Sequence, residues 1–177
     1  ARRRQRDTLR GAWLTMFEEA TEEAAFSTGE ARLSESEGVV LGFLLFCCHT
    51  RSRCSDAARI EVEPYLDLSD DSVDPDFEFC FIEASTDRQK TKTGGIASCT
   101  DKEASITGMA NGLSGRRWAK AWLVLRQRLG LDASIDGCLM QTPLRDGSFG
   151  KSRILPGQAT EWLRFLAIKL GVEPILL

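Results

Sequence analysis

The residues best suited to chemistry in this sequence are cations that lie next to predicted helices and strands. Arg53 follows an apolar helix and begins a second, short one that carries Ser55 and Asp56. Lys90 and Lys92 lie in a polar, glycine-ended turn between two predicted strands. A guanidinium binds two phosphate oxygens at once, and an ammonium adds a point charge or a proton. These positions favour a phosphate ligand, and the alternative is an ordinary surface arginine with a solvated lysine turn.

Other catalytic patterns are missing from the sequence. It contains no Walker loop, Gly-x-Gly-x-x-Gly, Gly-x-Ser-x-Gly or His-Glu-x-x-His motif. Its single histidine, His49, ends an apolar helix and has no orienting carboxylate nearby in sequence, which indicates a structural role. Asp70, Ser72, Asp74 and Asp76 alternate as in a calcium loop, but Pro75 stands where that loop needs glycine. We therefore predict a solvated loop there and no bound metal.

The cysteines predict neither a disulfide framework nor a zinc site. No Cys-x-x-Cys pair occurs, and the cysteines closest to His49 have no standard zinc spacing. We expect reduced thiols in a cytosolic or nuclear protein. The six positions are Cys47, Cys48, Cys54, Cys80, Cys99 and Cys138.

Length and charge exclude several classes of protein. The 177 residues, 42% hydrophobic and 28% charged, suit one globular domain or part of a larger one. The longest strongly apolar run, Val39 to Cys48, is too short to span a bilayer, and no apolar segment follows the basic N-terminus. We expect a protein that is not secreted and, because no initiator Met is present, a processed chain or a fragment.

The charges are distributed unevenly along the chain. Residues 1–84 carry 9 Lys/Arg and 18 Asp/Glu, whereas residues 85–177 carry 14 Lys/Arg and 8 Asp/Glu. The basic half leaves a polyanion partner open despite a pI of about 5.3.

Hydrophobic periodicity predicts helices, then a small sheet, then helices. An amphipathic helix is predicted over 8–25, and Ser34 with Glu37 forms a capping box before an apolar helix. Strands are predicted over 59–66, 77–83 and, weakly, 96–107. Ser114 is the predicted N-cap of a helix that ends at Leu129, and the polar side of this helix carries five basic residues. Residues 132–156 are predicted to be loop-rich, and a last helix is predicted over 157–170. The predicted fold class is α+β, mostly helical, with a small antiparallel sheet of two or three strands. The five basic residues are Arg116, Arg117, Lys120, Arg126 and Arg128.

The order of these motifs resembles the catalytic domain of tyrosine recombinases, the phage-integrase family. Arg53-Cys54-Ser55-Asp56 resembles that family's first active-site box, in which Arg-x-Ser-Glu/Asp follows a buried helix and a tight turn. Thr91-Lys92-Thr93-Gly94 resembles the lysine turn of the two-strand hairpin that comes next. The helices around Trp118–Arg128 and Glu161–Leu170 are similar to those that lead to the second box. The resemblance covers roughly residues 35–171.

The resemblance implies a role for each cation. Arg53 would stabilise charge on the scissile phosphate, and Lys92 would protonate the leaving 5′-oxygen, with Lys90 as the alternative lysine. Asp56 would support the arginine helix. Lys90 and three cations before and on the later helix would contact DNA, and no metal or nucleotide cofactor is implied. Those three cations are Arg116, Arg117 and Lys120.

The family's nucleophile is the main departure from the pattern. The family needs a His/Lys-x-x-Arg box and a tyrosine after the lysine turn, but no histidine follows His49 and the single tyrosine, Tyr65, precedes Lys92. We expect residues 1–34 to be an N-terminal helix and linker region, and residues 35–177 to be a partial catalytic domain truncated before the second box. This chain alone would be inactive, and the complete enzyme would act as a tetramer on double-stranded DNA, in the nucleus if eukaryotic and otherwise in the cytoplasm.

Three hypotheses follow from these observations. The chain is the front half of an enzyme for DNA recombination and integration, such as a mobile element encodes. Alternatively, it is a non-catalytic DNA-binding or interaction remnant of the same fold. In the third hypothesis it is an unrelated α+β domain, which predicts that Arg53 pairs with a nearby carboxylate such as Asp56 or Glu61.

Overall fold

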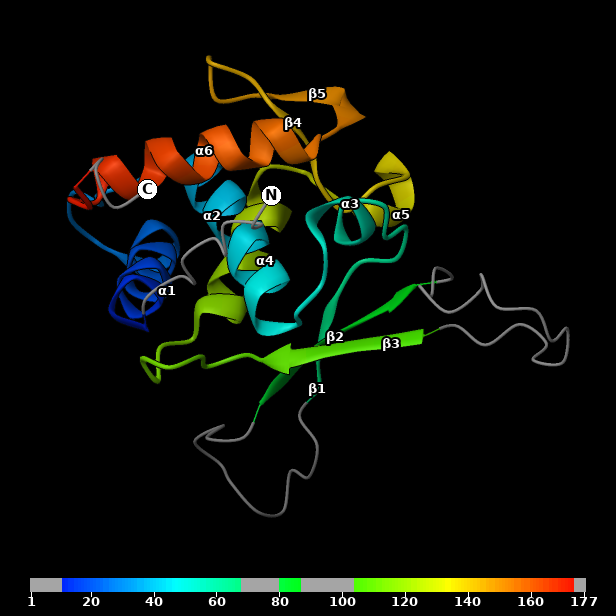
Figure 1. Ribbon diagram of the computed structural model, residues 1–177, viewed down its shortest axis with the longest axis horizontal. Helices are drawn as coiled ribbons and strands as arrows, with labels where there is room; N and C mark the ends of the chain where they lie inside the picture. Colours follow the sequence, from blue (N-terminus) through cyan, green and yellow to red (C-terminus); the bar gives the residue numbers. More distant parts are fainter. Residues whose placement is uncertain (1–10, 68–79, 87–103, 174–177) are drawn as a thin grey trace, which may run out of the picture.

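The computed structural model describes residues 11–67, 80–86 and 104–173, and in this part of the chain it is an α+β protein. Figure 1 shows the longer helices between a three-stranded sheet on one side and a two-stranded hairpin on the other. The predicted fold class is therefore confirmed, and the hairpin adds a second antiparallel sheet.

The centre of the molecule is helix α2 (Glu35–His49). Its predicted capping box is present: Ser34 Oγ accepts from the Glu37 amide at 3.3 Å, and Glu37 Oε2 accepts from the Ser34 amide at 2.8 Å. This box satisfies backbone donors that the first turn of a helix leaves free. Helix α2 has no polar face, and its buried side chains form the middle of the core. They are Val39, Val40, Leu41, Phe43, Leu45 and Phe46.

Helices α1 (Gly11–Phe26), α4 (Trp118–Arg128) and α6 (Pro156–Lys169) pack around α2. Phe17 and Ala20 of α1 are buried, so this first helix belongs to the same core as α2. Helix α4 packs against Gly42, where a Cβ atom would meet the Trp122 indole. The Trp122 Nε1 atom donates to the Val39 carbonyl oxygen at 3.0 Å. Glycine at position 42 therefore sets the distance between α2 and α4.

The larger sheet has the order β1–β2–β3 and is antiparallel throughout. It comprises β1 (Tyr65–Asp67), β2 (Phe81–Thr86) and β3 (Ala104–Met109), with Leu66 opposite Ile82 and Ala84 opposite Ile106. Ile82 and Ala84 are buried toward the helices. Predicted strand residues 77–79 and 96–103, like the acidic loop around Pro75, lie outside the described residues.

The first predicted strand was placed too early. Residues 59–64 are not a strand, and β1 begins only at Tyr65, directly after Pro64. Proline has no amide to donate to a sheet. Glu63 is also bound elsewhere, because its carboxylate accepts from Arg126 and from the Ala133 amide.

The predicted start of the third long helix was also wrong. Helix α4 begins at Trp118 with Arg117 in the N-cap position, whereas Ser114 lies in the preceding turn. The Ser114 amide donates to Glu18 Oε2 at 2.7 Å, so a tertiary contact holds this residue outside the helix. Gly112 and Gly115, with φ of 60° and 71°, continue the turn up to the helix.

The segment predicted as loop-rich contains three short elements. These are α5 (Ala133–Asp136), β4 (Gln141–Pro143) and β5 (Phe149–Arg153). The β4–β5 turn closes by a bond from the Leu144 amide to the Ser148 carbonyl oxygen at 2.9 Å, with Gly147 at φ 85°. Strands this short show too little alternation to be found by periodicity.

Candidate functional site

Arg53 lies at the end of a hydrogen-bonded turn that joins α2 to α3 (Cys54–Ala57). Thr50 Oγ1 donates to the Phe46 carbonyl oxygen at 2.6 Å, and the Ser52 amide donates to the Cys47 carbonyl oxygen at 3.0 Å. Arg51 takes the left-handed conformation, with φ 55°. The Arg53 carbonyl oxygen then accepts from the Ala57 amide at 2.9 Å. The backbone on both sides of Arg53 is thus held by hydrogen bonds.

The side chain of Arg53 is exposed to solvent. Among the described residues it forms no ion pair, and Asp56 instead accepts a 3.4 Å bond from Ser55 Oγ. The hypothesis of an unrelated domain predicted a pair between Arg53 and Asp56 or Glu61, and neither pair is present. The guanidinium is therefore available to a ligand from solution.

The two candidate lysines, Lys90 and Lys92, lie outside the described residues. They belong to the connection between β2 and β3, which pair in antiparallel register from Phe81↔Met109 to Thr86↔Ala104. The hairpin that the sequence predicted around these lysines therefore exists as a pair of strands.

Arg116 and Arg117 lie just before α4 and beside α1, on either side of one carboxylate. Arg116 Nη1 is 3.7 Å from Glu22 Oε2, and Arg117 Nε is 3.5 Å from Glu22 Oε1. The Arg117 guanidinium also lies 5.8 Å from the centre of the Phe26 ring. Both arginine side chains are more than half exposed, and exposed pairs of this kind contribute little free energy. A phosphate could therefore replace Glu22 as their partner.

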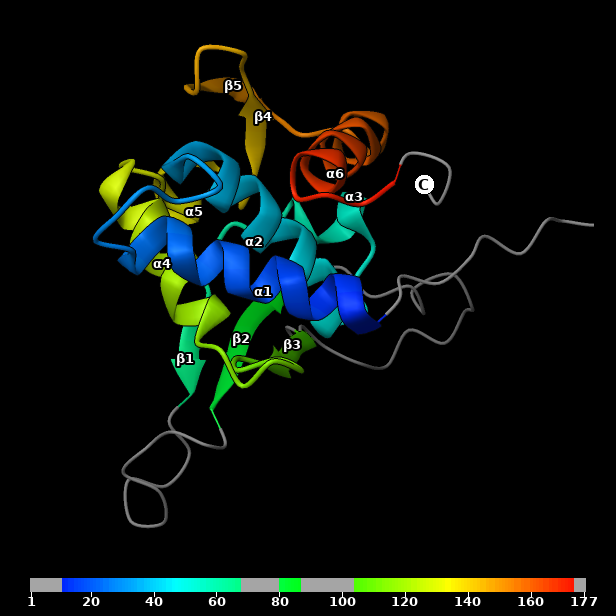
Figure 2. The ribbon, with the colours of Figure 1, turned by 90° about the vertical axis from the view of Figure 1, so that its left-hand side faces the viewer.

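These cations do not form one cluster with Arg53. Lys120, one turn further along α4, is exposed. Helix α3, which follows Arg53, packs against α2 and α6, whereas Arg116 and Arg117 lie beside α1. Figure 2 shows α3 next to α6 and α4 on the other side of α2. The predicted DNA contacts therefore fall on two separate parts of the surface.

His49 is part of a buried polar contact between three segments. Its Nε2 atom lies 2.8 Å from Glu18 Oε1, and its ring stacks on Trp118 with centroids 5.0 Å apart. Glu18 also accepts from the Leu113 amide at 3.0 Å and from the Ser114 amide at 2.7 Å. These partners all belong to the protein itself, so His49 and Glu18 join α1, α2 and the turn before α4.

Tyr65 occupies an exposed position in β1, where its hydroxyl donates to Glu83 Oε2 at 2.7 Å. The neighbouring Glu83 carboxylate raises the pKa of the Tyr65 phenol. A raised pKa keeps the hydroxyl protonated at neutral pH.

Arg126 was predicted on the polar side of its helix, and this prediction was wrong. Its side chain is 1% exposed and donates to both Glu63 oxygens, at 2.5 and 2.8 Å, and to the Leu139 carbonyl oxygen at 2.6 Å. The guanidinium lies 5.4 Å from the Trp122 ring centre. Burial of an arginine is possible here because the carboxylate and the carbonyl oxygen satisfy its donors.

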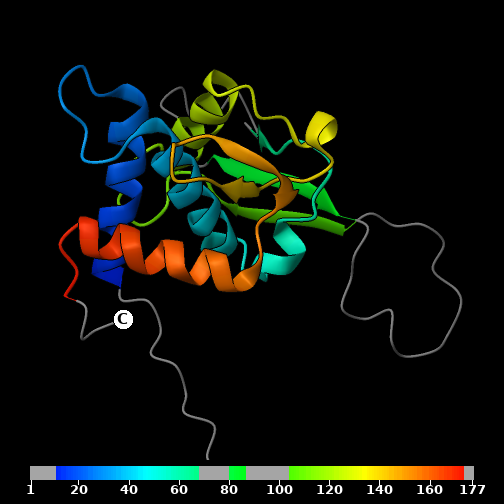
Figure 3. The same cartoon turned by 90° about the horizontal axis from the view of Figure 1, so that it is seen from above.

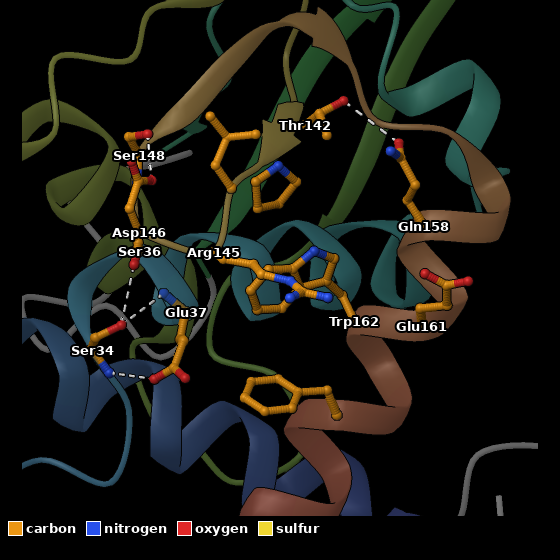
Figure 4. Close-up of a pocket in the computed structure, with 14 residues that line it drawn as sticks. Ser34, Ser36, Glu37, Thr142, Arg145, Asp146, Ser148, Gln158, Glu161 and Trp162 are labelled. Carbon is orange, nitrogen blue, oxygen red and sulfur yellow. Dashed lines mark hydrogen bonds between the residues drawn. The ribbon is translucent and has the colours of Figure 1, made fainter.

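A groove that sequence analysis missed lies between the β4–β5 hairpin, α6 and the first turn of α2 (Figure 4). Its volume is about 840 Å³. Trp162 and Phe165 form an aromatic wall, with ring centroids 5.5 Å apart at 88°, and Arg145 extends over it from the hairpin. Glu37 at the other end is bound by Lys169 Nζ at 2.7 Å. Phe165, three residues after Trp162, is a sequence signal that this helix has a second apolar side, and in the structure it is half exposed.

Comparisons with known proteins returned no relative: no family model, no curated protein and no solved structure matches this chain. Across the described ranges, no helix is long and apolar enough to cross a membrane. In the same part of the chain, no cluster of three or more His, Cys, Asp or Glu side chains could hold a metal ion.

Proposed function

We propose that this chain is the front half of a tyrosine recombinase catalytic domain and that it binds duplex DNA through its phosphates. The observation that carries the proposal is Arg53: it is exposed, free of carboxylate partners among the described residues, and fixed between a buried helix and a short one. A three-stranded antiparallel sheet follows, and its β2–β3 connection contains Lys90 and Lys92. This order is the one that the resemblance to the family requires.

In the proposed reaction, each cation stabilises a different part of the transition state. Arg53 contacts the non-bridging oxygens of the scissile phosphate and stabilises the charge that develops on them. Lys92 donates a proton to the leaving 5′-oxygen. Asp56, on the helix that follows Arg53, keeps a supporting role. The nucleophile is a tyrosine that forms a 3′-phosphotyrosine, and this bond conserves the energy of the broken phosphodiester, so no nucleotide cofactor is needed.

Tyr65 does not fit the nucleophile's role. It precedes the lysine turn and is bound to Glu83 in the sheet. The tyrosine would have to come from residues that are not among these 177. The second candidate function, DNA binding without strand cleavage, draws its support from the same fact.

The proposal is tested by the salt dependence of DNA binding. The logarithm of the affinity for a fluorescent duplex is measured by anisotropy against the logarithm of the salt concentration. Each phosphate contact contributes about 0.9 to the slope of this line for duplex DNA. We expect Arg53→Ala to lower the slope by about 0.9, the loss of one contact, and Lys92→Ala to lower it similarly.

Arg128→Ala is the matched control, because it removes the same charge at the opposite end of α2, where Arg128 Nη1 lies 3.0 Å from Glu35. Its slope should equal that of the wild type. Equal slopes for Arg53→Ala and the wild type would overturn the proposed phosphate contact, and no duplex binding at low salt would overturn both candidate functions. A covalent DNA adduct that disappears in Tyr65→Phe would contradict the assignment of the nucleophile to residues elsewhere.

A further inference from the structure

Strand β5 carries two exposed cations, Lys151 and Arg153. Neither side chain forms an ion pair or a hydrogen bond with another residue in the described part of the chain. Other exposed arginines differ in this respect, because Arg32 and Arg128 are each bound to a glutamate. Lys151 and Arg153 are therefore free to bind an anion from solution.

The backbone that carries these cations is anchored in the core. Ile154 and Met140 are buried, and the Ile154 amide donates to the Met140 carbonyl oxygen at 2.9 Å. Thr142 Oγ1 donates to the Arg153 carbonyl oxygen at 3.2 Å. Residues two apart in a strand project to the same side, with about 6.6 Å between their Cα atoms. Lys151 and Arg153 therefore extend together from one fixed strand.

Nearby acidic residues do not compensate this charge along the sequence. Residues 147–160, which include all of β5 except none of its flanking turn at Asp146, contain no Asp or Glu. The turn of the hairpin is different, because Arg145 is followed by Asp146 and lines the same groove as Glu161. The positive charge of the hairpin is therefore concentrated on β5.

Strand β5 ends close to the turn that holds Arg53. It leads through Ile154 and Leu155 into α6, and α6 contacts α3, the short helix that begins after Arg53. Figure 3 shows α3 beside the first turns of α6, at the end of the hairpin where β5 joins this helix. Arg53 and β5 therefore lie at the same end of α6, whereas Arg116 and Arg117 lie beside α1.

We propose that Lys151 and Arg153 form a second phosphate-binding surface for the duplex DNA that Arg53 contacts. The identity of the polyanion rests on the proposed function. A duplex carries one negative charge per about 1.7 Å of its axis, so two cations about 6.6 Å apart each meet a phosphate. The duplex then runs from the α2–α3 turn along β5, and Arg116 and Arg117 contribute no contact to this path.

The test is the salt dependence of duplex binding by the double variant Lys151→Ala/Arg153→Ala. Its affinity for a fluorescent duplex is measured by anisotropy over a range of salt concentrations, after circular dichroism has confirmed its fold. The loss of two phosphate contacts should lower the slope of the logarithm of affinity against the logarithm of salt by about 1.8. The variant Lys151→Arg/Arg153→Lys keeps both charges and should keep the wild-type slope.

Arg32→Ala/Arg128→Ala is the matched control, because it removes the same net charge from two exposed pairs, with Glu23 and Glu35. Its slope should equal that of the wild type. Equal losses in this control and in the β5 double variant would overturn the proposed surface, since net charge alone would then explain the effect.

The single variant Arg53→Ala separates this inference from the proposed function. A wild-type slope for the β5 double variant beside a lowered slope for Arg53→Ala would overturn the β5 surface alone. A lowered slope for the β5 double variant beside a wild-type slope for Arg53→Ala would support the β5 surface and overturn the Arg53 contact. The absence of duplex binding at low salt would overturn both.

Discussion

The carboxylate of Glu18 in α1 lies 2.8 Å from the Nε2 atom of His49 in α2, and the two side chains are only 0% and 8% exposed. The same carboxylate accepts from the backbone amides of Leu113 and Ser114. One buried acid therefore connects three segments that are far apart in the chain. A buried charge of this kind is tolerated only because donors surround it.

Replacement of Glu18 should destabilise the fold strongly. In Glu18→Gln one carboxylate oxygen becomes an amide NH2 group, which cannot accept from the donors that this oxygen serves in the wild type. Bonds to a charged group contribute about 1.5–3 kcal/mol, and we expect the free energy of unfolding in urea to fall by about 2–3 kcal/mol. Glu19→Gln, on the adjacent residue with no hydrogen bond among the described residues, should stay within about 0.5 kcal/mol of the wild type. Equal losses in the two variants would contradict the role of Glu18.

The buried Glu18 carboxylate should also make the free energy of unfolding depend on pH. Burial alone would raise the pKa of Glu18, but the hydrogen bonds from His49, Leu113 and Ser114 together hold it below its ordinary value of 4.5. A carboxyl whose pKa is lower in the folded state stabilises the fold above its unfolded pKa and loses this contribution as the pH falls through the folded pKa. Wild-type stability, followed by urea unfolding, should therefore decline more steeply than that of Glu18→Gln below about pH 4.5. Parallel curves would contradict this assignment.

Gly112 should be intolerant of any side chain. Its φ is 60°, and a Cβ atom there would strike the Glu18 carboxylate. Gly115 has a similar φ of 71° but open space around it, which makes Gly115→Ala the matched control. The left-handed conformation alone costs about 1–2 kcal/mol, and Gly112→Ala should lose at least about 2 kcal/mol more than Gly115→Ala in urea unfolding. Similar losses would show that Glu18 moves aside without cost.

Gly42→Ala should destabilise the protein although alanine is the better helix former. An alanine at this position favours the isolated helix by about 1 kcal/mol, but its methyl group would displace the Trp122 indole. Overpacking of a core costs about 1–3 kcal/mol, so we expect a lower midpoint of thermal unfolding. Gly157→Ala in the first turn of α6, where nothing lies within 4 Å of the added methyl, should leave the midpoint unchanged or raise it. A higher midpoint for Gly42→Ala would show that α4 can move away from α2.

Replacement of Arg126 by alanine should lower the free energy of unfolding more than the same replacement of Arg128, which is half exposed. Arg126→Ala leaves Glu63 and the Leu139 carbonyl oxygen without their donor, and removal of one partner of a buried pair costs about 3–5 kcal/mol. Arg128→Ala removes a half-exposed pair with Glu35 and should cost below about 1 kcal/mol. Urea unfolding of both variants gives the comparison, and a similar cost for the two would mean that burial of Arg126 contributes little.

The elements whose signals are local could be predicted from the amino-acid sequence. The capping box at Ser34 and Glu37, the apolar helix behind it and the α+β class all follow from neighbours within a few residues. Backbone donors and side-chain periodicity act over one or two helical turns, so the pattern alone reveals them.

The contacts between residues far apart in the chain became visible only in the folded structure. Glu18 meets His49 across 31 positions, Arg126 meets Glu63 across 63, and the Ser114 amide meets Glu18 across 96. Two of these contacts changed a local expectation: Arg126 is buried and not on the polar side of α4, and Ser114 lies in a turn and not at the helix N-cap. The groove beside Trp162 likewise exists because the β4–β5 hairpin packs near α6. Burial and charge pairing depend on which surfaces meet, and that information is carried by the whole fold and not by any short stretch of sequence.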